Sequence, residues 1–239
     1  MLQQIGFDVK TADPFQQADY SSWIDAMHAL KWDYVVIASP PKEHLAQVWS
    51  CIAQGIPVLC EKPLCTNEQY HAATSLPKDA KVMVAYNWLY NKSVMDYAKE
   101  VQQNPPGSFG MVCEQSRDLP DWGLLLDHVS HDISILDYVS GGINSITAAH
   151  YYEDEVVKSW AVLGMTKGGK FSLSERVYVP TENIFRVSQI NQVDLVPEQQ
   201  MYWDMLDNFL NGHYAPGVEQ ALRYQYWLEE IARYGEIHK

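Results

Sequence analysis

Three residues of the sequence combine types and positions that suit acid–base or anion-binding chemistry. Lys62 stands between Glu61 and Pro63, directly after the apolar run IPVLC. Asp127 and His131 are spaced i, i+4 within DWGLLLDHVSHDISILDYVSGG, so a helix would place both on one face. An ammonium group, a carboxylate and an imidazole are groups that proteins use to bind anions and to transfer protons. Whether they act together depends on the elements that carry them.

The helix predicted over residues 122–139 has two kinds of face. Asp127, His131 and Ser134 lie opposite an apolar stripe, which favours a helix that lines a cleft. The competing interpretation is a solvated face with i, i+4 pairs that contribute roughly 0.2–0.5 kcal/mol each. His128 and Asp132 form a separate lateral pair about 100° away, and one ion would not collect both pairs, so we expect no metal site. The apolar stripe consists of Leu125, Val129, Ile133 and Leu136.

Composition and charge exclude several classes of protein. The chain has 239 residues, of which 47% are hydrophobic, enough for one large or two modest domains. Its 17 basic and 30 acidic residues give a formal charge of −13, which would repel nucleic acid and anionic membrane surfaces. It has no apolar run of about 18 residues and no signal-peptide pattern at its start, so we expect a cytoplasmic protein. Its four cysteines form no C-x-x-C pair and are expected to be reduced thiols.

The first half of the chain alternates short apolar runs with amphipathic stretches, which is typical of parallel α/β units. The run at 33–38 is apolar on both faces, so we expect it in the buried middle of a parallel sheet. The other expected strands are 7–13, which ends at Asp13, and the segments IPVLC and KVMVA. Helices are expected over about 20–30, from Pro41 to Gly55, and from Thr66 or Asn67 to about 76.

In the second half, strands follow one another without intervening helices, which predicts a largely antiparallel sheet with one face open to helices or to another subunit. The segment TKGGK is expected to form a hairpin turn. We expect residues 1–90 to form one domain and residues 91–239 a second, whose last helices pack back on the first. The expected elements are strands at 109–117, 143–153, 156–167, 170–179 and 183–190, and helices at about 197–210 and 218–234.

Two predicted strands end in residues that suit a ligand site. The carboxyl ends of parallel strands form the crevice in which doubly wound proteins bind ligands. Ser39, Pro40 and Pro41 follow one such strand, and Lys62 follows the next. Proline fixes the backbone, so a side chain beside it is held in place. His44 lies one turn into the following helix, where local packing is the favoured interpretation.

Taken in order, these motifs resemble the glucose-fructose oxidoreductase/inositol dehydrogenase family, often called Gfo/Idh/MocA. The resemblance covers nearly the whole chain and implies an NAD(P)-binding Rossmann domain joined to an α+β substrate domain. It also implies reversible oxidation of sugars, cyclitols or related alcohols. The segments that carry it are VVIASPPKEHLAQVWSCIAQGIPVLCEKPL, the Tyr86–Asn87 pair, GLLLDHVSHDISILDYVSGG and the open sheet that follows.

Carried onto this sequence, the resemblance implies that Lys62 is the lysine of the family's E-K-P motif, and that Asp127 and His131 are its helix-borne acid and base. His131 would take the hydroxyl proton, Lys62 would stabilise the developing alkoxide, and Asp127 would position the substrate. The family commonly has a small residue where this chain has His128, so the substrate side of the pocket is expected to differ. The implied substrate-binding residues are Tyr86, Asn87, Trp88 and His128, and the implied cofactor-binding residues are Asp13, Ser39, Pro40, Pro41, His44 and Glu61.

The sequence contains no G-x-G, although a G-x-G-x-x-G loop normally opens a dinucleotide-binding fold. Its opening LQQIGFDVKTADP looks like the end of a first helix, a turn at Gly6 and a second strand. We therefore expect an incomplete Rossmann-type parallel sheet that lacks the first strand and the phosphate loop. An incomplete gene product is the favoured explanation, and the alternatives are a sheet that closes around the gap and a gap that another chain covers. Asp13 falls where the family places the acid that binds the adenosine ribose, which implies NAD in preference to NADP. Without the loop, cofactor binding is expected to be weak.

Two other functions remain compatible with the sequence. One is a non-catalytic ligand-binding or oligomerisation protein derived from the same fold, and the other, ranked last, is a metal-dependent lyase or isomerase. We expect a sugar-like small molecule as the ligand, and a homodimer or homotetramer formed through the free face of the open sheet. Four aromatic residues suit a sugar pocket, although core packing is the simpler role for each: Tyr86, Trp88, Tyr151 and Tyr152.

Overall fold

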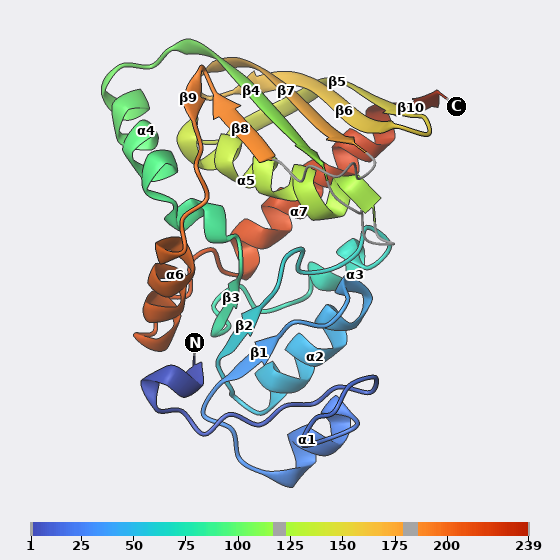
Figure 1. Ribbon diagram of the computed structural model, residues 1–239, viewed down its shortest axis with the longest axis vertical. Helices are drawn as coiled ribbons and strands as arrows, with labels where there is room; N and C mark the ends of the chain where they lie inside the picture. The colour runs from blue at the N-terminus through green and yellow to red at the C-terminus, as the bar shows by residue number, and fades with distance from the viewer. Residues whose placement is uncertain (1, 117–122, 179–185, 239) are drawn as a thin grey trace.

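The computed structural model describes residues 2–116, 123–178 and 186–238, and it contains two sheets with helices between and around them (Figure 1). The smaller sheet has three parallel strands in the order β1-β2-β3, and the larger has seven strands in the order β10-β5-β6-β7-β4-β8-β9. This arrangement confirms the predicted α/β plus α+β fold class, with a short Rossmann-type sheet and a second, mostly antiparallel one.

The first sheet consists of β1 (Val35–Ile37), β2 (Val58–Cys60) and β3 (Val82–Val84). Helix α2 (Pro41–Ala53) connects the first two strands and begins and ends where the sequence predicts, with Pro41 at its first turn and Gly55 at a φ of +72° just beyond its end. The helix packs Leu45 and Val48 against the buried strands.

The strand predicted at residues 7–13 is wrong. This segment forms only an isolated parallel bridge between Ala12 and Tyr20, beyond the 3-10 helix η1 (Leu2–Ile5) and before helix α1 (Trp23–Ala29). Its polar groups bond locally, since the Thr11 N–H donates to Asp19 Oδ2 at 2.8 Å. As a result β1 is an edge strand of its sheet, and Val36 is 46% exposed instead of buried as predicted.

The helix predicted from Thr66 or Asn67 is shorter than expected, because α3 spans only Tyr70–Ala73. Neither predicted cap residue caps it: the Asn67 Oδ1 accepts a hydrogen bond from Gln225 of the last helix at 2.6 Å. The helix ends well before residue 76 because Pro77 disfavours a helical conformation in the residue that precedes it.

Sequence reasoning assigned no element to residues 91–106, where the structure has helix α4 (Lys92–Gln103), preceded by the 3-10 turn η2 (Asn87–Tyr90). Asn91 caps α4, because its Oδ1 accepts the N–H groups of Ser93 at 3.0 Å and Val94 at 3.3 Å. A helical pattern was available in the sequence, since the buried residues of α4 are Val94, Tyr97, Ala98 and Val101.

The second sheet is mixed. Strands β5–β6, β6–β7, β4–β8 and β8–β9 are antiparallel pairs, whereas β10–β5 and β4–β7 are parallel. The predicted hairpin joins β6 and β7, where Gly169 has a φ of +137° and a Cβ there would meet the Gly107 carbonyl oxygen at 2.0 Å. The strands are β4 (Gly107–Ser116), β5 (Ile143–Glu153), β6 (Val157–Thr166), β7 (Gly169–Tyr178), β8 (Arg186–Ile190), β9 (Val193–Asp194) and β10 (Gly235–His238). Of the predicted strands, residues 117, 179 and 183–185 lie outside the described residues, and β9 and β10 were not predicted.

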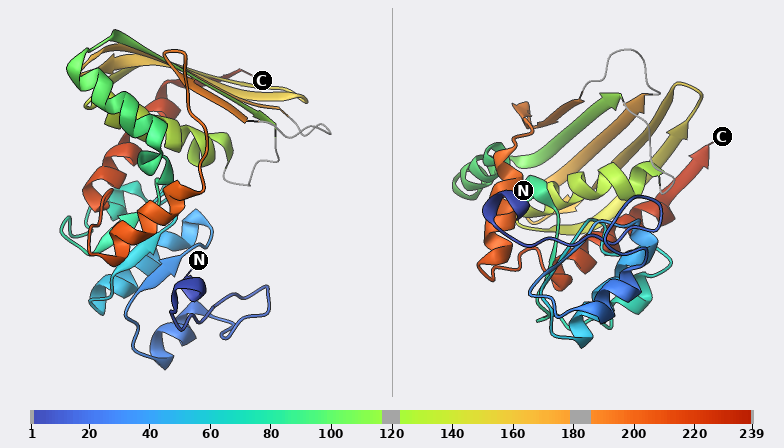
Figure 2. Two further views of the ribbon diagram at one scale, coloured as in Figure 1. Left: turned by 60° about the vertical axis from the view of Figure 1, so that its left-hand side comes forward. Right: turned by 60° about the horizontal axis from the view of Figure 1, so that its bottom comes forward.

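One layer of helices lies between the two sheets. It contains α4, the π-helical turn η3 (Leu125–Val129), which continues into α5 (Ser130–Val139), and α7 (Val218–Tyr234) (Figures 1 and 2). Helix α7 packs Ala221 on the first core and Leu228 on the second. Helix α6 (Gln200–Leu210) packs Phe209 on the other face of the first sheet, against Met83. The views show no helix on the outer face of the large sheet among the described residues.

Candidate active site

Lys62 and Asp127 meet between the two sheets. Lys62 follows β2, and its Nζ lies 2.8 Å from Oδ1 of Asp127 in η3. The same ammonium group donates to the backbone oxygen of Asp127. The side chain of Lys62 is 11% exposed and that of Asp127 is 13% exposed, so the ion pair is largely buried but still reaches solvent. The ion pair thus joins the carboxyl edge of the first sheet to the helix under the second.

His128 completes the surroundings of Asp127, because its Nε2 lies 3.1 Å from Asp127 Oδ2. Burial favours the protonated form of Asp127, but the contact with His128 and the positive charge of Lys62 outweigh burial and hold the pKa of Asp127 well below its usual range. Asp127 is therefore an anion at neutral pH. A carboxylate that is fixed by two neighbours can orient a bound polar group without itself taking part in proton transfer.

His131 lies one turn after Asp127 and is 8% exposed. Its ring meets the ring of Tyr86 edge-on, with centroids 6.2 Å apart. Tyr86 in turn packs against Tyr224 of α7 at 4.9 Å, and belongs to the same core cluster as Cys60 and its neighbours. The structure therefore places His131 against the core of the first sheet.

The helix that carries these residues is not solvated, so that interpretation of its polar face is wrong. Its residues from 126 to 139 are buried except for the exposed Tyr138, and Leu125 before them is half-buried. His128 contacts Asp127, and Asp132 lies beside Glu175 of the sheet, so both residues have neighbours beyond the predicted His128–Asp132 pair. A π-helical turn changes the angular spacing of side chains that a regular helix would give, and such turns are frequent at functional sites.

The residues predicted to hold a cofactor lie at the carboxyl edge of the first sheet and in the N-terminal segment. Ser39 Oγ donates to Gln47 Oε1 at 2.8 Å, and Pro40 and Pro41 lead into α2. Glu61 is exposed, and its N–H donates to the Ile37 carbonyl at 2.8 Å. Together these residues turn the chain away from the ends of β1 and β2.

Two of the predicted cofactor residues have structural contacts of their own. His44 is fully buried, with ring nitrogens 2.6 Å from the Ser39 carbonyl and 2.7 Å from the Pro63 carbonyl, so it ties the two loops together as the packing interpretation predicted. Asp13 lies in a turn in which its Oδ1 accepts the N–H groups of Phe15 at 2.7 Å and Gln16 at 3.1 Å.

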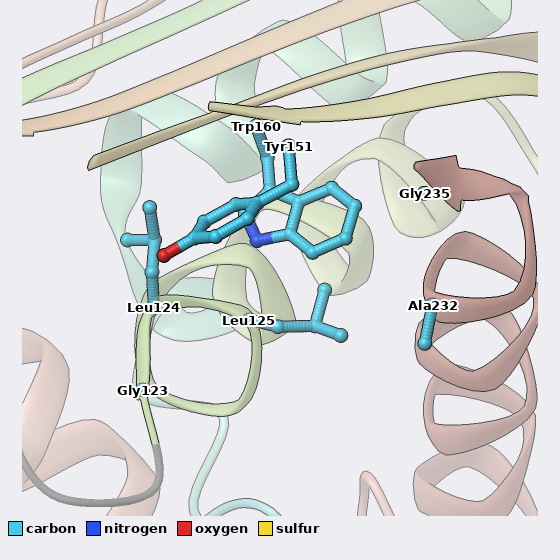
Figure 3. Close-up of a pocket in the computed structure, with 7 residues that line it drawn as sticks. All are labelled: Gly123, Leu124, Leu125, Tyr151, Trp160, Ala232 and Gly235. Carbon is cyan, nitrogen blue, oxygen red and sulfur yellow. The ribbon is translucent and has the colours of Figure 1, made fainter. Parts of the chain in front are cut away.

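Of the predicted substrate residues, Tyr86 and Trp88 are buried in the core, and Asn87 is 8% exposed at the start of η2. Tyr152 is 45% exposed, whereas Tyr151 lies beside Trp160 at 5.0 Å. These last two rings line a cavity of about 230 Å³ (Figure 3). Its other walls are apolar or backbone, which suits packing better than a sugar: Gly123, Leu124, Leu125, Ala232 and Gly235.

Sequence reasoning missed one buried cluster, formed by Cys113, Asp132 and Glu175. The three other cysteines are also free and buried, as expected of reduced thiols. None of the described helices is long and apolar enough to span a membrane.

The fold and this site define a two-domain protein with a Rossmann-type first sheet and an α+β second half. Solved structures share that fold. The chain matches the dehydrogenase WlbA (WbpB) from Thermus thermophilus, solved with NAD and UDP-GlcNAcA, with a TM-score of 0.74, 16% identity, and coverage of 100% of this chain and 90% of that one. It matches a myo-inositol dehydrogenase from Corynebacterium glutamicum with a TM-score of 0.71, 16% identity, and coverage of 94% and 87%.

Residues 6–87 match the sequence model described as "Oxidoreductase family, NAD-binding Rossmann fold", which is that of Gfo/Idh/MocA. This match covers the part of the chain that contains the three-stranded parallel sheet. A stretch of 43 residues is also 51% identical to the inositol 2-dehydrogenase of Rhodococcus erythropolis, a match that spans 18% of this chain and 12% of that relative.

Proposed function

We propose that this protein is an NAD(P)-dependent oxidoreductase that interconverts a secondary alcohol and a ketone on a sugar, a cyclitol or a related small molecule. The observation that carries the proposal is the 2.8 Å contact between Lys62 Nζ and Asp127 Oδ1, because it joins groups from the two halves of the chain at the carboxyl edge of the Rossmann-type sheet. In this proposal residues 1–90 carry the cofactor, and residues 91–239 carry the substrate and the subunit interface.

The residues present fit part of a dinucleotide site. Ser39, Glu61 and Lys62 follow the ends of β1 and β2, where doubly wound folds bind ligands, and the turn at Asp13 holds a carboxylate that suits the two hydroxyls of a ribose better than a 2′-phosphate. The sequence has no G-x-G to let a pyrophosphate approach a helix. We therefore infer that NAD is preferred over NADP and that this chain binds it weakly.

The side chains have separate roles in the proposed reaction. When bound, a nicotinamide cofactor would supply or accept the hydride. His131 takes the hydroxyl proton of the alcohol, and the Lys62 ammonium donates a hydrogen bond to the same oxygen as negative charge develops on it. Asp127, which is held as an anion, keeps Lys62 in place and accepts a hydrogen bond from a neighbouring substrate hydroxyl. His128 contacts Asp127 at Oδ2, the oxygen that does not face Lys62, and its ring narrows the substrate site.

Titration with NADH tests cofactor binding directly. The eight tryptophans provide the signal, and we expect their fluorescence to be quenched saturably below millimolar NADH, as suits weak binding, with still weaker quenching by NADPH. An unchanged signal up to millimolar NADH would favour a non-catalytic protein that keeps the fold. The same titration of Lys81→Met, a change of an exposed lysine at the opposite end of the sheet, is the matched control.

We also propose that the open face of the large sheet joins copies of this chain into a dimer or a tetramer. The side chains that support an interface are large, apolar and exposed on β6, β4 and β8: Leu163, Met165, Val112 and Val187.

A charge on this face should separate the subunits. We expect the purified chain to elute as a dimer or tetramer and Leu163→Lys to elute as a monomer, because an ammonium group would be buried unpaired in the interface. Light scattering after size exclusion gives the masses. Leu30→Lys, at an exposed leucine away from the sheet, should leave the mass unchanged. A monomeric parent protein, or equal masses for the parent and Leu163→Lys, would rule out this interface.

A further inference from the structure

A polar row crosses the inner, helix-covered face of the large sheet. The strand register pairs Ser188 with Cys113, Cys113 with Glu175, and Glu175 with Trp160. Residues directly paired across neighbouring strands point to the same face, so these four side chains stand side by side. Glu175 and Cys113 are 0% exposed. Beside this row lie buried Gln115 and a set of apolar side chains: Phe109, Met111, Val162, Phe171, Leu173 and Ile190.

Asp132 of α5, the helix that covers this face, lies beside the row. It is 1% exposed, and the side-chain ligand atoms of Cys113, Asp132 and Glu175 all lie within 4.8 Å of one another. Gln115 Nε2 donates to Glu175 Oε1 at 2.7 Å, whereas Glu175 Oε2 accepts no such bond from the described residues. Two carboxylates at this distance in an apolar interior cannot both stay ionised, so one of them must hold a proton.

We propose that Asp132 and Glu175 share one proton, and that this buried carboxylic acid–carboxylate pair fixes the helix η3–α5 on the sheet and so positions His131, the residue next to Asp132. The sharing of the proton stands independently of the proposed function. Only the functional importance of the position of His131 depends on the proposed oxidoreductase activity.

The surroundings of Glu175 favour the protonated pair. Burial raises the pKa of Glu175 well above its usual value, and the negative charge of Asp132 raises it further, while Cys113 and Gln115 lower it in part. Asp132 of α5 and Cys113 of β4 are the titratable groups among these neighbours, and Gln115 is an uncharged donor. From β8 and β6, the facing residues Ser188 and Trp160 carry no charge. At neutral pH the pair therefore carries a single negative charge.

A proton also satisfies the cluster without a metal ion. Gln115 already donates to one oxygen of Glu175, and Cys113 Sγ lies 3.0 Å from Ser188 Oγ, so the ligand atoms are engaged with uncharged partners. A proton shared with Asp132 would serve the remaining oxygen of Glu175, Oε2, which accepts no hydrogen bond from the described residues.

The pair predicts a stability that depends on pH with a definite sign. Because the folded-state pKa of Glu175 lies above the ordinary value of 4.5, its proton stabilises the folded chain fully below that value, and the stabilisation is lost as pH rises through the folded-state pKa. Between pH 4.5 and the folded-state pKa of Glu175, each rise of one pH unit reduces the folding equilibrium constant by about tenfold.

The test uses the full chain and three variants. Glu175→Gln replaces the shared proton by a permanent N–H, Glu175→Ala removes the bridge, and Glu114→Gln is a matched control at a half-exposed residue of β4. We expect the parent protein to lose stability above about pH 5 in urea titrations, with the loss absent in Glu175→Gln and retained in Glu114→Gln. An infrared band of a protonated carboxyl group should be present in the parent at neutral pH and absent in Glu175→Gln.

The NMR resonances of the His131 ring report on its position without any turnover, so they separate this inference from the enzymatic proposal. They should shift in Glu175→Ala and stay near the parent values in Glu175→Gln. Absence of the carboxyl band, parallel pH profiles for the parent and Glu175→Gln, or one tightly bound divalent metal per chain would overturn the shared proton. Equal His131 resonances in all variants would overturn the positioning role.

Discussion

Replacing Lys62 with Met is expected to lower the turnover of an alcohol substrate by at least a hundredfold. Met keeps most of the length of the side chain but has no ammonium group to donate to the oxygen that becomes an alkoxide. Removing one donor of this kind from a desolvated site typically costs about 10²–10³ in kcat. The Michaelis constant should change much less, because the contact strengthens mainly in the transition state.

The same substitution should destabilise the folded chain by about 3 kcal/mol, because it leaves the carboxylate of Asp127 buried without its cation. The double variant Lys62→Met/Asp127→Leu should recover most of this stability, since both charges are then gone, but none of the turnover. Urea unfolding gives the two free energies of unfolding, and steady-state kinetics with NAD gives kcat and KM.

Lys81→Met is the control for Lys62→Met, because this exposed lysine precedes β3 at the far end of the same sheet. Lys81→Met should change neither the turnover nor the free energy of unfolding. If Lys62→Met turned over substrate as fast as the parent protein, Lys62 would have no catalytic role. If it unfolded at the same urea concentration, the ion pair with Asp127 would carry no net stability.

Local signals predicted much of the fold. Pro41 and Gly55 fix the two ends of α2, and the alternation of apolar residues gives β5, β6 and β7 with their hairpin. The strand predicted at residues 7–13 failed for a reason that no local pattern reveals, since a strand forms only where a neighbouring strand accepts its backbone hydrogen bonds. In this segment the side chain of Asp19 takes that role for Thr11.

The candidate site was predictable in its residue types more than in its geometry. The spacing of Asp127 and His131 and the position of Lys62 after a strand located the three groups, but the sequence predicted neither the π-helical turn η3 nor the contact of His128 with Asp127. The pairing of Asp132 with Glu175 depends on strand register, which the sequence does not specify. A signal was nevertheless present in β7, where the inward positions Phe171, Leu173 and Val177 share one face with an acid, Glu175.

His131→Gln is expected to reduce kcat/KM for alcohol oxidation by about 10²–10⁴, the usual contribution of a positioned general base. Gln fills a similar volume and can still donate or accept a hydrogen bond, but it cannot take a proton. The acidic limb of the pH–rate profile, which reports ionisation of the base, should therefore disappear, while NADH binding measured by fluorescence should remain.

His28→Gln, a change of an exposed histidine in α1, controls for the loss of an imidazole elsewhere in the chain and should leave the profile intact. Ketone reduction by His131→Gln should fall by a similar factor, because the group that takes the proton in one direction returns it in the other. A full acidic limb in His131→Gln would assign the base to another residue. His128 would be the first to test, since its Nε2 lies 3.1 Å from Asp127 Oδ2.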